Sequence, residues 1–385
     1  MGNIIITVIK LMFYEFIFSD FFEVIYKKNL EYHFNKFKKH PIKNKIILIT
    51  EPSCSHGEVI PGLVKYCLDL NYKVDILLTN KIFAEKPLEM FKYNKNVQVF
   101  NFGLEQYKLA LHSKVINKYN YIIFSSSRVY YDYNLYKERF VLDYINNTIP
   151  ANKIILIEHH LNLLEDTNKQ KYKISALPEF CTNNDLTMIN PHYFGKTKIH
   201  KKNRIVKFIT AGSIEKARKN HNLLIDAVEK LLTKNIDNFE IIVVGDGNLD
   251  IENIAIKNKI KCTGRVSYQN LYKYVQNSDY ILPLLDSNNP KHYRYIKDGT
   301  SGTFQLCYGF LKPMIINEYF AKVHGFSDKN AIIYTENNLA EKMEYALNQS
   351  EKEYNEMIEN IKILEKSIYQ KSLKNMESYI GKVRK

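Results

Sequence analysis

Several features that define other protein classes are missing from this sequence. Tryptophan is absent, and the five cysteines (Cys54, Cys67, Cys181, Cys262 and Cys307) form no CxxC unit and show no paired spacing. A disulfide framework is therefore excluded, and we expect free, mostly buried thiols in a reducing compartment. No Asp-x-Asp motif or paired His/Cys spacing stands in a convincing context, so the sequence predicts no metal site and no cofactor.

Acidic residues are fewer than basic residues. The chain has 55 Lys and Arg against 41 Asp and Glu, a formal net charge of +14. A basic chain suits anionic partners such as nucleic acids, acidic lipids or phosphorylated small molecules. No zinc finger, RNA-recognition signature or basic-region heptad array is present, so we do not expect a nucleic-acid partner.

Long, clean hydrophobic runs are also missing. Residues 3–25 are apolar and aromatic, but Lys10, Glu15, Asp20 and Glu23 interrupt them, and a spanning helix needs about 20 consecutive apolar residues. The N-terminus lacks the basic start of a secretory signal. We expect an amphipathic helical extension over residues 1–40, followed by a basic stretch, in contact with an anionic membrane surface. The alternative is a helix packed on the protein's own core.

The chain is long enough to form two domains. The sequence has 385 residues and 45% hydrophobic residues, which is typical of a folded globular protein. In the first half, short apolar runs predict buried parallel strands at 46–50, 73–78, 97–102, 121–125 and 153–158. Helices are expected between them at 58–70, 105–116 and 134–146.

The second half restarts the same alternation after a linker-like stretch at 177–202. Strands are predicted at 206–211, 240–244, 280–284, 314–317 and 331–334, with helices at 220–232, 270–276, from 301, from 338 and from 351. We therefore expect an α/β fold with two Rossmann-like domains facing a cleft. The predicted domains are residues 41–195 and 196–365, with a C-terminal helix at 366–385.

The stretch from Asp298 to Ile316, DGTSGTFQLCYGFLKPMII, carries the most information. A Gly/Ser/Thr loop runs into an apolar helix, and the first turn of a helix has unpaired N–H groups and a positive dipole end. Small residues let an anion approach closely, so Thr300, Ser301, Gly302 and Thr303 predict a phosphate-binding site. The alternative is an ordinary capped helix with Thr300 or Ser301 as its N-cap.

Four segments in order resemble the group 1 C-terminal domain of retaining GT-B glycosyltransferases, over about residues 203–365. They are FITAGSIEKARKNHNLLIDAVEKL, IIVVGDGN, GRVSYQNLYKYVQNSDYILPL and the stretch from Asp298. The first half resembles the acceptor domain of this fold more weakly. The resemblance implies a metal-independent enzyme of the hexosyltransferase type that uses a nucleotide-diphosphate sugar.

The resemblance also implies donor-binding residues. The family's diphosphate-binding Arg position falls on Ser213, a departure, and its Lys position falls on Lys219, with Lys216 and Arg218 nearby. We include in the expected donor site Gly212, Gly245, Asp246 and Arg265. The alternative for the basic cluster is a solvated helix start.

The family's Glu-x7-Glu motif is altered here. Asp298 stands at the first Glu, and Leu306 stands at the second, which usually binds the ribose hydroxyls. The neighbouring Gln305 is the expected substitute. Asp298 alternatively is a plain acid flanking a helix.

On the acceptor side, His159 and His160 end a buried strand at the expected cleft edge, so we name them with Asp298 as candidate catalytic residues. His56, Gly57 and Glu58 lie in another loop at that edge and are the candidate acceptor-binding residues. Structural histidines are the alternative at both places, and residues 190–195 are expected to form the hinge.

Together these features predict a cytoplasmic glycosyltransferase, peripheral on the membrane, that acts in cell-surface polysaccharide or glycolipid synthesis. Two alternatives remain open. One is a non-catalytic nucleotide-sugar-binding or scaffold protein of the same fold, which the changes at Ser213 and Leu306 favour. The other is a nucleotide-sugar epimerase, which needs no acceptor.

Overall fold

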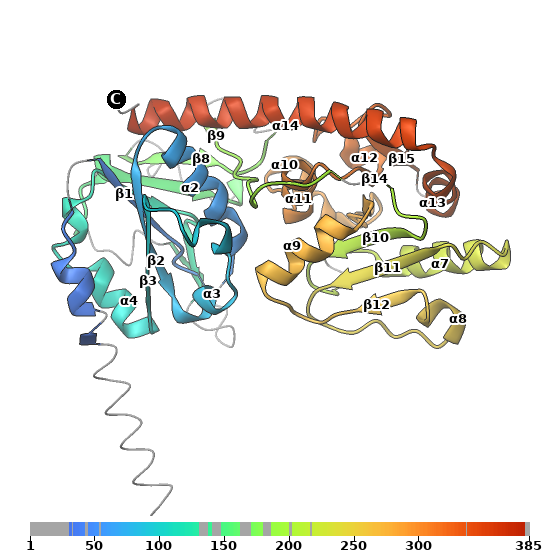
Figure 1. Cartoon of the computed structure of the whole chain (residues 1–385), viewed down its shortest axis with the longest axis horizontal. Coiled ribbons are helices and arrows are strands. Elements are labelled where there is room, and N and C mark those ends of the chain that lie inside the picture. Colours follow the sequence, from blue (N-terminus) through green and yellow to red (C-terminus); the bar gives the residue numbers. More distant parts are fainter. Residues whose placement is uncertain are drawn as a thin grey trace, which may run out of the picture.

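The computed structural model describes residues 31–32, 34–42, 45–53, 55–130, 138–140, 148–161, 171–179, 186–199, 202–215, 218–335 and 337–381. Two parallel sheets form two domains side by side (Figure 1). None of the helices in these ranges is long and apolar enough to cross a membrane.

The first domain is built on a seven-stranded parallel sheet. Its strands follow the order β3-β2-β1-β4-β7-β8-β9, and most of their residues, except in the edge strand β3, are buried because helices cover both faces. Helices α2 (Ile60–Asp69) and α4 (Leu104–Leu111) pack on opposite faces. The strands are β1 (Ile46–Thr50), β2 (Lys73–Thr79), β3 (Val97–Phe102), β4 (Tyr121–Phe124), β7 (Ile154–Glu158), β8 (Lys173–Ala176) and β9 (Thr187–Met188).

The second domain repeats the plan with a six-stranded parallel sheet in the order β12-β11-β10-β13-β14-β15. Its strands are β10 (Val206–Ala211), β11 (Phe239–Val244), β12 (Ile260–Cys262), β13 (Tyr280–Ile281), β14 (Met314–Asn317) and β15 (Ala331–Tyr334). Its helices are α7 (His221–Thr233), α8 (Ile254–Lys257), α9 (Tyr268–Asn277), α10 (Arg294–Lys297), α11 (Gly302–Phe310), α12 (Glu318–Ala321) and α13 (Leu339–Asn348).

The strand order reverses between β1 and β4 in the first sheet and between β10 and β13 in the second. At such a switch point the loops beyond the carboxyl ends of the two strands diverge and leave a crevice. The predicted α/β fold with two Rossmann-like domains is therefore confirmed.

Helix α14 (Glu351–Ile380) crosses from the second domain to the first (Figure 1). It begins with a capping box formed by Ser350 and Glu353. Near its start, Tyr354 packs in the core of the second domain; near its end, Met376 packs in the core of the first. The boundary predicted between residues 365 and 366 thus lies inside one continuous helix.

Three further expectations need correction. The helix predicted at 134–146 is wrong where the structure describes it, because β6 (Glu138–Phe140) pairs antiparallel with β5 (Arg128–Tyr130). The linker stretch at 177–202 contains β9, the edge strand of the first sheet. The extension predicted at 1–40 lies outside the described residues up to residue 30, and Phe37 is fully buried in the core of the first domain.

The two domains meet through close backbone packing at the hinge. A Cβ atom on Gly309 of α11 would lie 2.3 Å from the carbonyl oxygen of His192. A Cβ atom on Gly62 of α2 would lie 2.6 Å from the Cα atom of Pro191. Only glycine fits at these two positions, which hold residues 191–194 between the domains.

This packing predicts the effect of one added methyl group. We expect Gly309→Ala to lower the free energy of unfolding by about 1–3 kcal/mol, because the methyl group overlaps rigid backbone. Urea denaturation followed by circular dichroism measures this change. Gly302→Ala is the matched control, since a Cβ atom there meets nothing within 4 Å. Equal stability of the Gly309→Ala variant and the wild type would contradict the assigned hinge packing.

Candidate active site

Helix α11 begins at the carboxyl-end edge of the second sheet with an open first turn. Ser301 is its N-cap, and the Ser301 hydroxyl accepts from the backbone N–H of Thr303 (3.4 Å) and donates to Thr303 Oγ1 (3.1 Å). A Cβ atom on Gly302 would meet no other atom within 4 Å. Gly302 is also exposed, so an anion can approach the backbone of this turn closely.

Lys219 lies directly against this turn. It follows β10, and its ammonium group donates to the carbonyl oxygen of Pro283 (2.9 Å) and to Thr303 Oγ1 (3.2 Å). Pro283 follows β13, so the contact joins the two strands of the switch point. Lys219 is only 4% exposed, and burial lowers its pKa to about 7.

Two glycine turns bring the other predicted donor residues to the same edge. A Cβ atom on Gly245 would lie 1.8 Å from the carbonyl oxygen of Gly212, so glycine is required there. The backbone of Asp246 accepts from Ile214 N (2.8 Å), and the hydroxyl of Ser213 donates to Glu215 (2.8 Å). These contacts hold the loop after β10 against the loop after β11.

The remaining predicted donor residues have different surroundings. Arg218 is exposed, and Lys216 lies outside the described residues. Arg265 binds Glu85 of the first domain, with 3.0 Å between Nε and Oε1. Gln305 is buried and donates to the carbonyl oxygen of Pro191 (3.2 Å), and Leu306 packs in the apolar core. The structure therefore brings neither the Gln305 amide nor the Leu306 side chain into an open site.

Thr300 takes part in a hydrogen-bond network around Glu179, a buried carboxylate in the segment between the two domains. The carboxylate of Glu179 accepts from Thr300 (3.3 Å) and from the hydroxyl of Tyr308 (2.9 Å). His324 Nδ1 also bonds to it. Burial favours the neutral acid, but the His324 contact outweighs it and lowers the pKa of Glu179.

His159 and His160 follow β7 on the opposite side of the cleft. His159 Nε2 lies 2.8 Å from the carbonyl oxygen of Ser125, and burial, with the nearby His56, lowers the pKa of His159 to about 3. Burial and Arg294, whose Nη2 lies 2.9 Å from His160 Nε2, likewise lower the pKa of His160 to about 3. Both rings are therefore neutral near pH 7 and suited to orient hydroxyl groups.

Asp298 joins the same region through its backbone. Its carbonyl oxygen accepts from Leu161 N (2.9 Å), and His160 forms an isolated antiparallel bridge with Gly299. The three candidate catalytic residues, His159, His160 and Asp298, consequently lie where the loop after β7 meets the loop before α11. Among the described residues, no hydrogen-bond or ion-pair partner assigns a role to the Asp298 side chain.

The sequence analysis missed two buried carboxylates at this edge, Glu51 and Glu158. Glu51 accepts from the hydroxyls of Ser53 and Ser125, each at 2.6 Å, and burial raises its pKa. Glu158 accepts from the hydroxyl of Ser127 (2.6 Å). Each acid directly ends or follows a buried parallel strand, which is the sequence signal that identifies it.

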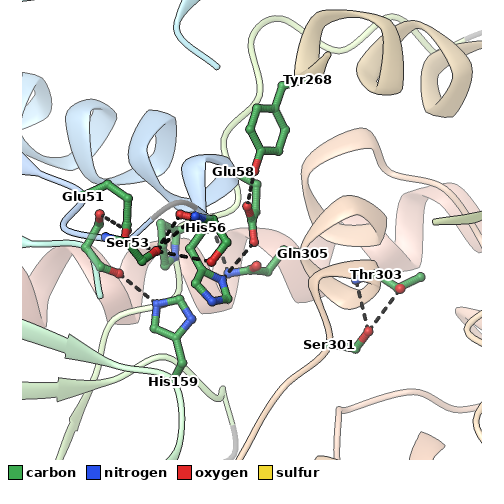
Figure 2. Close-up of polar contacts among 12 residues, drawn as sticks. Glu51, Ser53, His56, Glu58, His159, Tyr268, Ser301, Thr303 and Gln305 are labelled. Carbon is green, nitrogen blue, oxygen red and sulfur yellow. Dashed lines mark hydrogen bonds and ion pairs between the residues drawn. The ribbon is translucent and has the colours of Figure 1, made fainter. Parts of the chain in front are cut away.

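The acceptor-side loop contains a charged pair. His56 Nδ1 lies 3.4 Å from Glu58 Oε1, and the His56 ring lies 4.5 Å from the His159 ring (Figure 2). Burial alone would lower the pKa of His56, but the Glu58 and Glu51 carboxylates outweigh it and raise that pKa. Burial would raise the pKa of Glu58, and its contact with His56 instead lowers it to about 2.

A cavity of about 270 Å³ lies between the domains away from these groups. Its lining includes Phe194, Tyr272 and Phe310, and none of the predicted site residues. The groups suited to bind a diphosphate therefore lie outside this cavity. Among the described residues, no group of three or more His, Cys, Asp or Glu side chains is placed to hold a metal ion.

Comparison with solved structures shows the fold. TarM of S. aureus, in a complex with fondaparinux, α-GlcNAc-glycerol and UDP, has a TM-score of 0.55 at 13% identity over 87% of this chain and 99% of that chain. AviGT4, a glycosyltransferase of avilamycin A biosynthesis, has a TM-score of 0.52 at 10% identity over 88% and 98%. An α-glucosyltransferase with UDP and DNA bound has a TM-score of 0.51 at 12% identity over 87% and 95%.

These likenesses and the two switch points define the class of protein: the chain has the two-domain GT-B fold of glycosyltransferases. A family model described as glycosyl transferases group 1 matches residues 206–291. The chain thus has the GT-B fold, and part of its second domain matches the group 1 glycosyl transferase model, in line with the resemblance noted in its sequence. No curated protein sequence matches it.

The pKa of Lys219 gives a test that needs no turnover. At pH 8 an amine with a pKa of about 7 is mostly neutral, and an adjacent diphosphate raises that pKa and favours the ammonium form. We expect UDP binding at pH 8 to take up close to one proton, measured by calorimetry in buffers of different ionisation enthalpy. The Lys219→Met variant should take up none. Equal proton uptake by both proteins would contradict this position for the diphosphate.

Proposed function

We propose that this protein transfers a sugar from a nucleotide-diphosphate sugar to a glycan or lipid-linked acceptor. The observation that carries the proposal is the buried Lys219 amine beside the open first turn of α11. A diphosphate leaving group develops negative charge, and an ammonium group together with oriented N–H groups stabilises that charge. The polar loops of the first domain face this position and would hold the acceptor.

Two chemical properties are part of the proposal. Metal independence is supported by the cationic groups of the second domain, since Lys219 lies beside the first turn of α11 and Arg218 is close enough to the cleft to influence His160. Retention of anomeric configuration rests on the family resemblance. Two of the solved structures of similar fold were determined with UDP, so UDP-sugars are the first donors to test.

The acceptor and the location are proposed from the N-terminal region. Residues 3–25 are apolar and aromatic, and a basic stretch that includes Lys27, Lys28 and Lys36 follows them. Such a segment binds anionic lipid surfaces through both apolar contact and charge. This supports a cytoplasmic enzyme at the membrane face, acting in polysaccharide or glycolipid synthesis.

A second candidate function is supported by α11 itself. Leu306 presents an apolar side chain to the core, and Gln305 is occupied by Pro191. Neither provides the polar group that the related family uses for the ribose. A protein that binds a nucleotide sugar without transferring it is consistent with these contacts. Nucleotide binding without release of a nucleoside diphosphate, over a panel of donors and acceptors, would favour this candidate.

Substitution of the helix cap tests the transferase proposal. We expect Ser301→Ala to reduce kcat/KM for the nucleotide sugar at least about tenfold, which corresponds to about 1.4 kcal/mol. The variant loses a hydroxyl donor and loosens the first turn of α11. Ser350→Ala is the matched control, because Ser350 also caps a helix but lies at the start of α14. If both variants keep full kcat/KM, the proposed site is wrong.

Vesicle flotation tests the membrane proposal. We expect the full chain to float with anionic vesicles and a variant that lacks residues 1–30 to remain in the soluble fraction. The deletion ends before Phe37, which the core of the first domain needs. Neutral vesicles provide the control for charge. Equal flotation of both proteins would contradict the membrane proposal.

A further inference from the structure

One carboxylate connects the two domains beside the cleft. Glu58 Oε1 faces His56 of its own loop at 3.4 Å, and Glu58 Oε2 accepts from the Tyr268 hydroxyl at 2.8 Å. Tyr268 is the first residue of α9 in the second domain. Figure 2 shows the Tyr268 ring reaching from α9 to Glu58, with His56 on the other side of that carboxylate.

The contact is held in place by its surroundings. Tyr268 N donates to the carbonyl oxygen of Glu85 (2.8 Å), and Arg265 binds the Glu85 side chain. A Cβ atom on Gly57 would lie 2.8 Å from Tyr268 Cε2, so the Tyr268 ring packs against the loop backbone. Backbone and side-chain contacts with the first domain therefore hold the Tyr268 hydroxyl in place.

His56 is the group that this contact orients. It adopts a left-handed conformation with φ of 64°, and about a third (32%) of its side chain is exposed. The charged and titratable groups that interact with it are Glu51 and Glu58 in its own loop region, His159 and His160 after β7, and Arg218 in the second domain. The two carboxylates favour the imidazolium form of His56, whereas Arg218 opposes it.

We propose that Tyr268 is a positioning residue: when the domains close, it fixes the Glu58 carboxylate, which in turn holds the His56 imidazolium at the cleft. The protonation state of His56 therefore depends on whether the second domain has closed onto the first. In the transfer reaction proposed above, this imidazolium would face the anionic donor and add to the positive charge around the diphosphate. That last step rests on the proposed function, whereas the coupling itself does not.

The coupling is tested by titration of the His56 ring in the full-length protein with isotope-labelled histidine, assigned with a His56→Gln variant. We expect the pKa of His56 to fall by about one unit in Tyr268→Phe, since Glu58 loses one of the two partners that hold its carboxylate beside the His56 ring. The matched control is Tyr272→Phe. Tyr272 lies one turn later on α9, and its hydroxyl has no hydrogen-bond partner among the described residues. This control should titrate like the wild type.

The outcomes are distinct. An unchanged or raised pKa of His56 in Tyr268→Phe, or an equal fall in Tyr272→Phe, overturns the proposal. With an active donor, the pH profile of kcat/KM for Tyr268→Phe should shift by the same amount as the titration, and an unshifted profile also counts against it. If the wild type binds and turns over no nucleotide sugar, the proposed function fails, but the titration still decides the positioning role.

Discussion

The site depends on two positive groups that face each other. The N-terminus of α11 carries the positive end of a helix dipole, and the Lys219 amine lies beside it, bonded to Thr303 at 3.2 Å. Burial makes an ammonium group costly, which is why the pKa of Lys219 falls to about 7. An anion bound between these groups would offset the cost of burying the ammonium group, which is the physical basis of the proposed diphosphate site.

The second constraint is the hinge that holds the proposed anion site opposite the first domain. Residues 191–194 fit between the domains because Gly62 and Gly309 have no side chains, and α14 joins the two cores. The bridge between His160 and Gly299 then places the loop after β7 against the loop before α11. Polar groups of the first domain therefore lie opposite the donor-binding edge, which is the arrangement that transfer between two substrates requires.

Much of the fold could be predicted because buried parallel strands are continuous apolar runs. Val97–Phe102, Val206–Ala211 and Met314–Asn317 were predicted with the bounds that the structure shows. The short strand Ile260–Cys262 was missed, since two of its three residues are exposed and carry no apolar pattern. The span of α14 was missed because a helix pattern does not tell which core each turn contacts.

The positions of several candidate site residues could be predicted, but their side-chain partners could not. Glycine loops and the Ser/Thr-rich helix start are local signals, so the sequence placed Gly245, Ser301 and Lys219 at the sheet edge where the structure has them. Which atoms a side chain bonds depends on the tertiary structure. Gln305 bonds to Pro191, and Arg265 bonds to Glu85 of the other domain. Tyr268 precedes the helix predicted at 270–276, and only the domain packing shows its contact with Glu58.

The most direct test of this account is a crystal structure of the full chain with UDP bound. The account predicts both phosphate groups within hydrogen-bond distance of the Gly302 and Thr303 N–H groups, with Lys219 Nζ at the diphosphate. Electron density for the diphosphate elsewhere, such as in the cavity beside Phe194 and Tyr272, or an α11 N-terminus without any anion in the UDP complex, would contradict it.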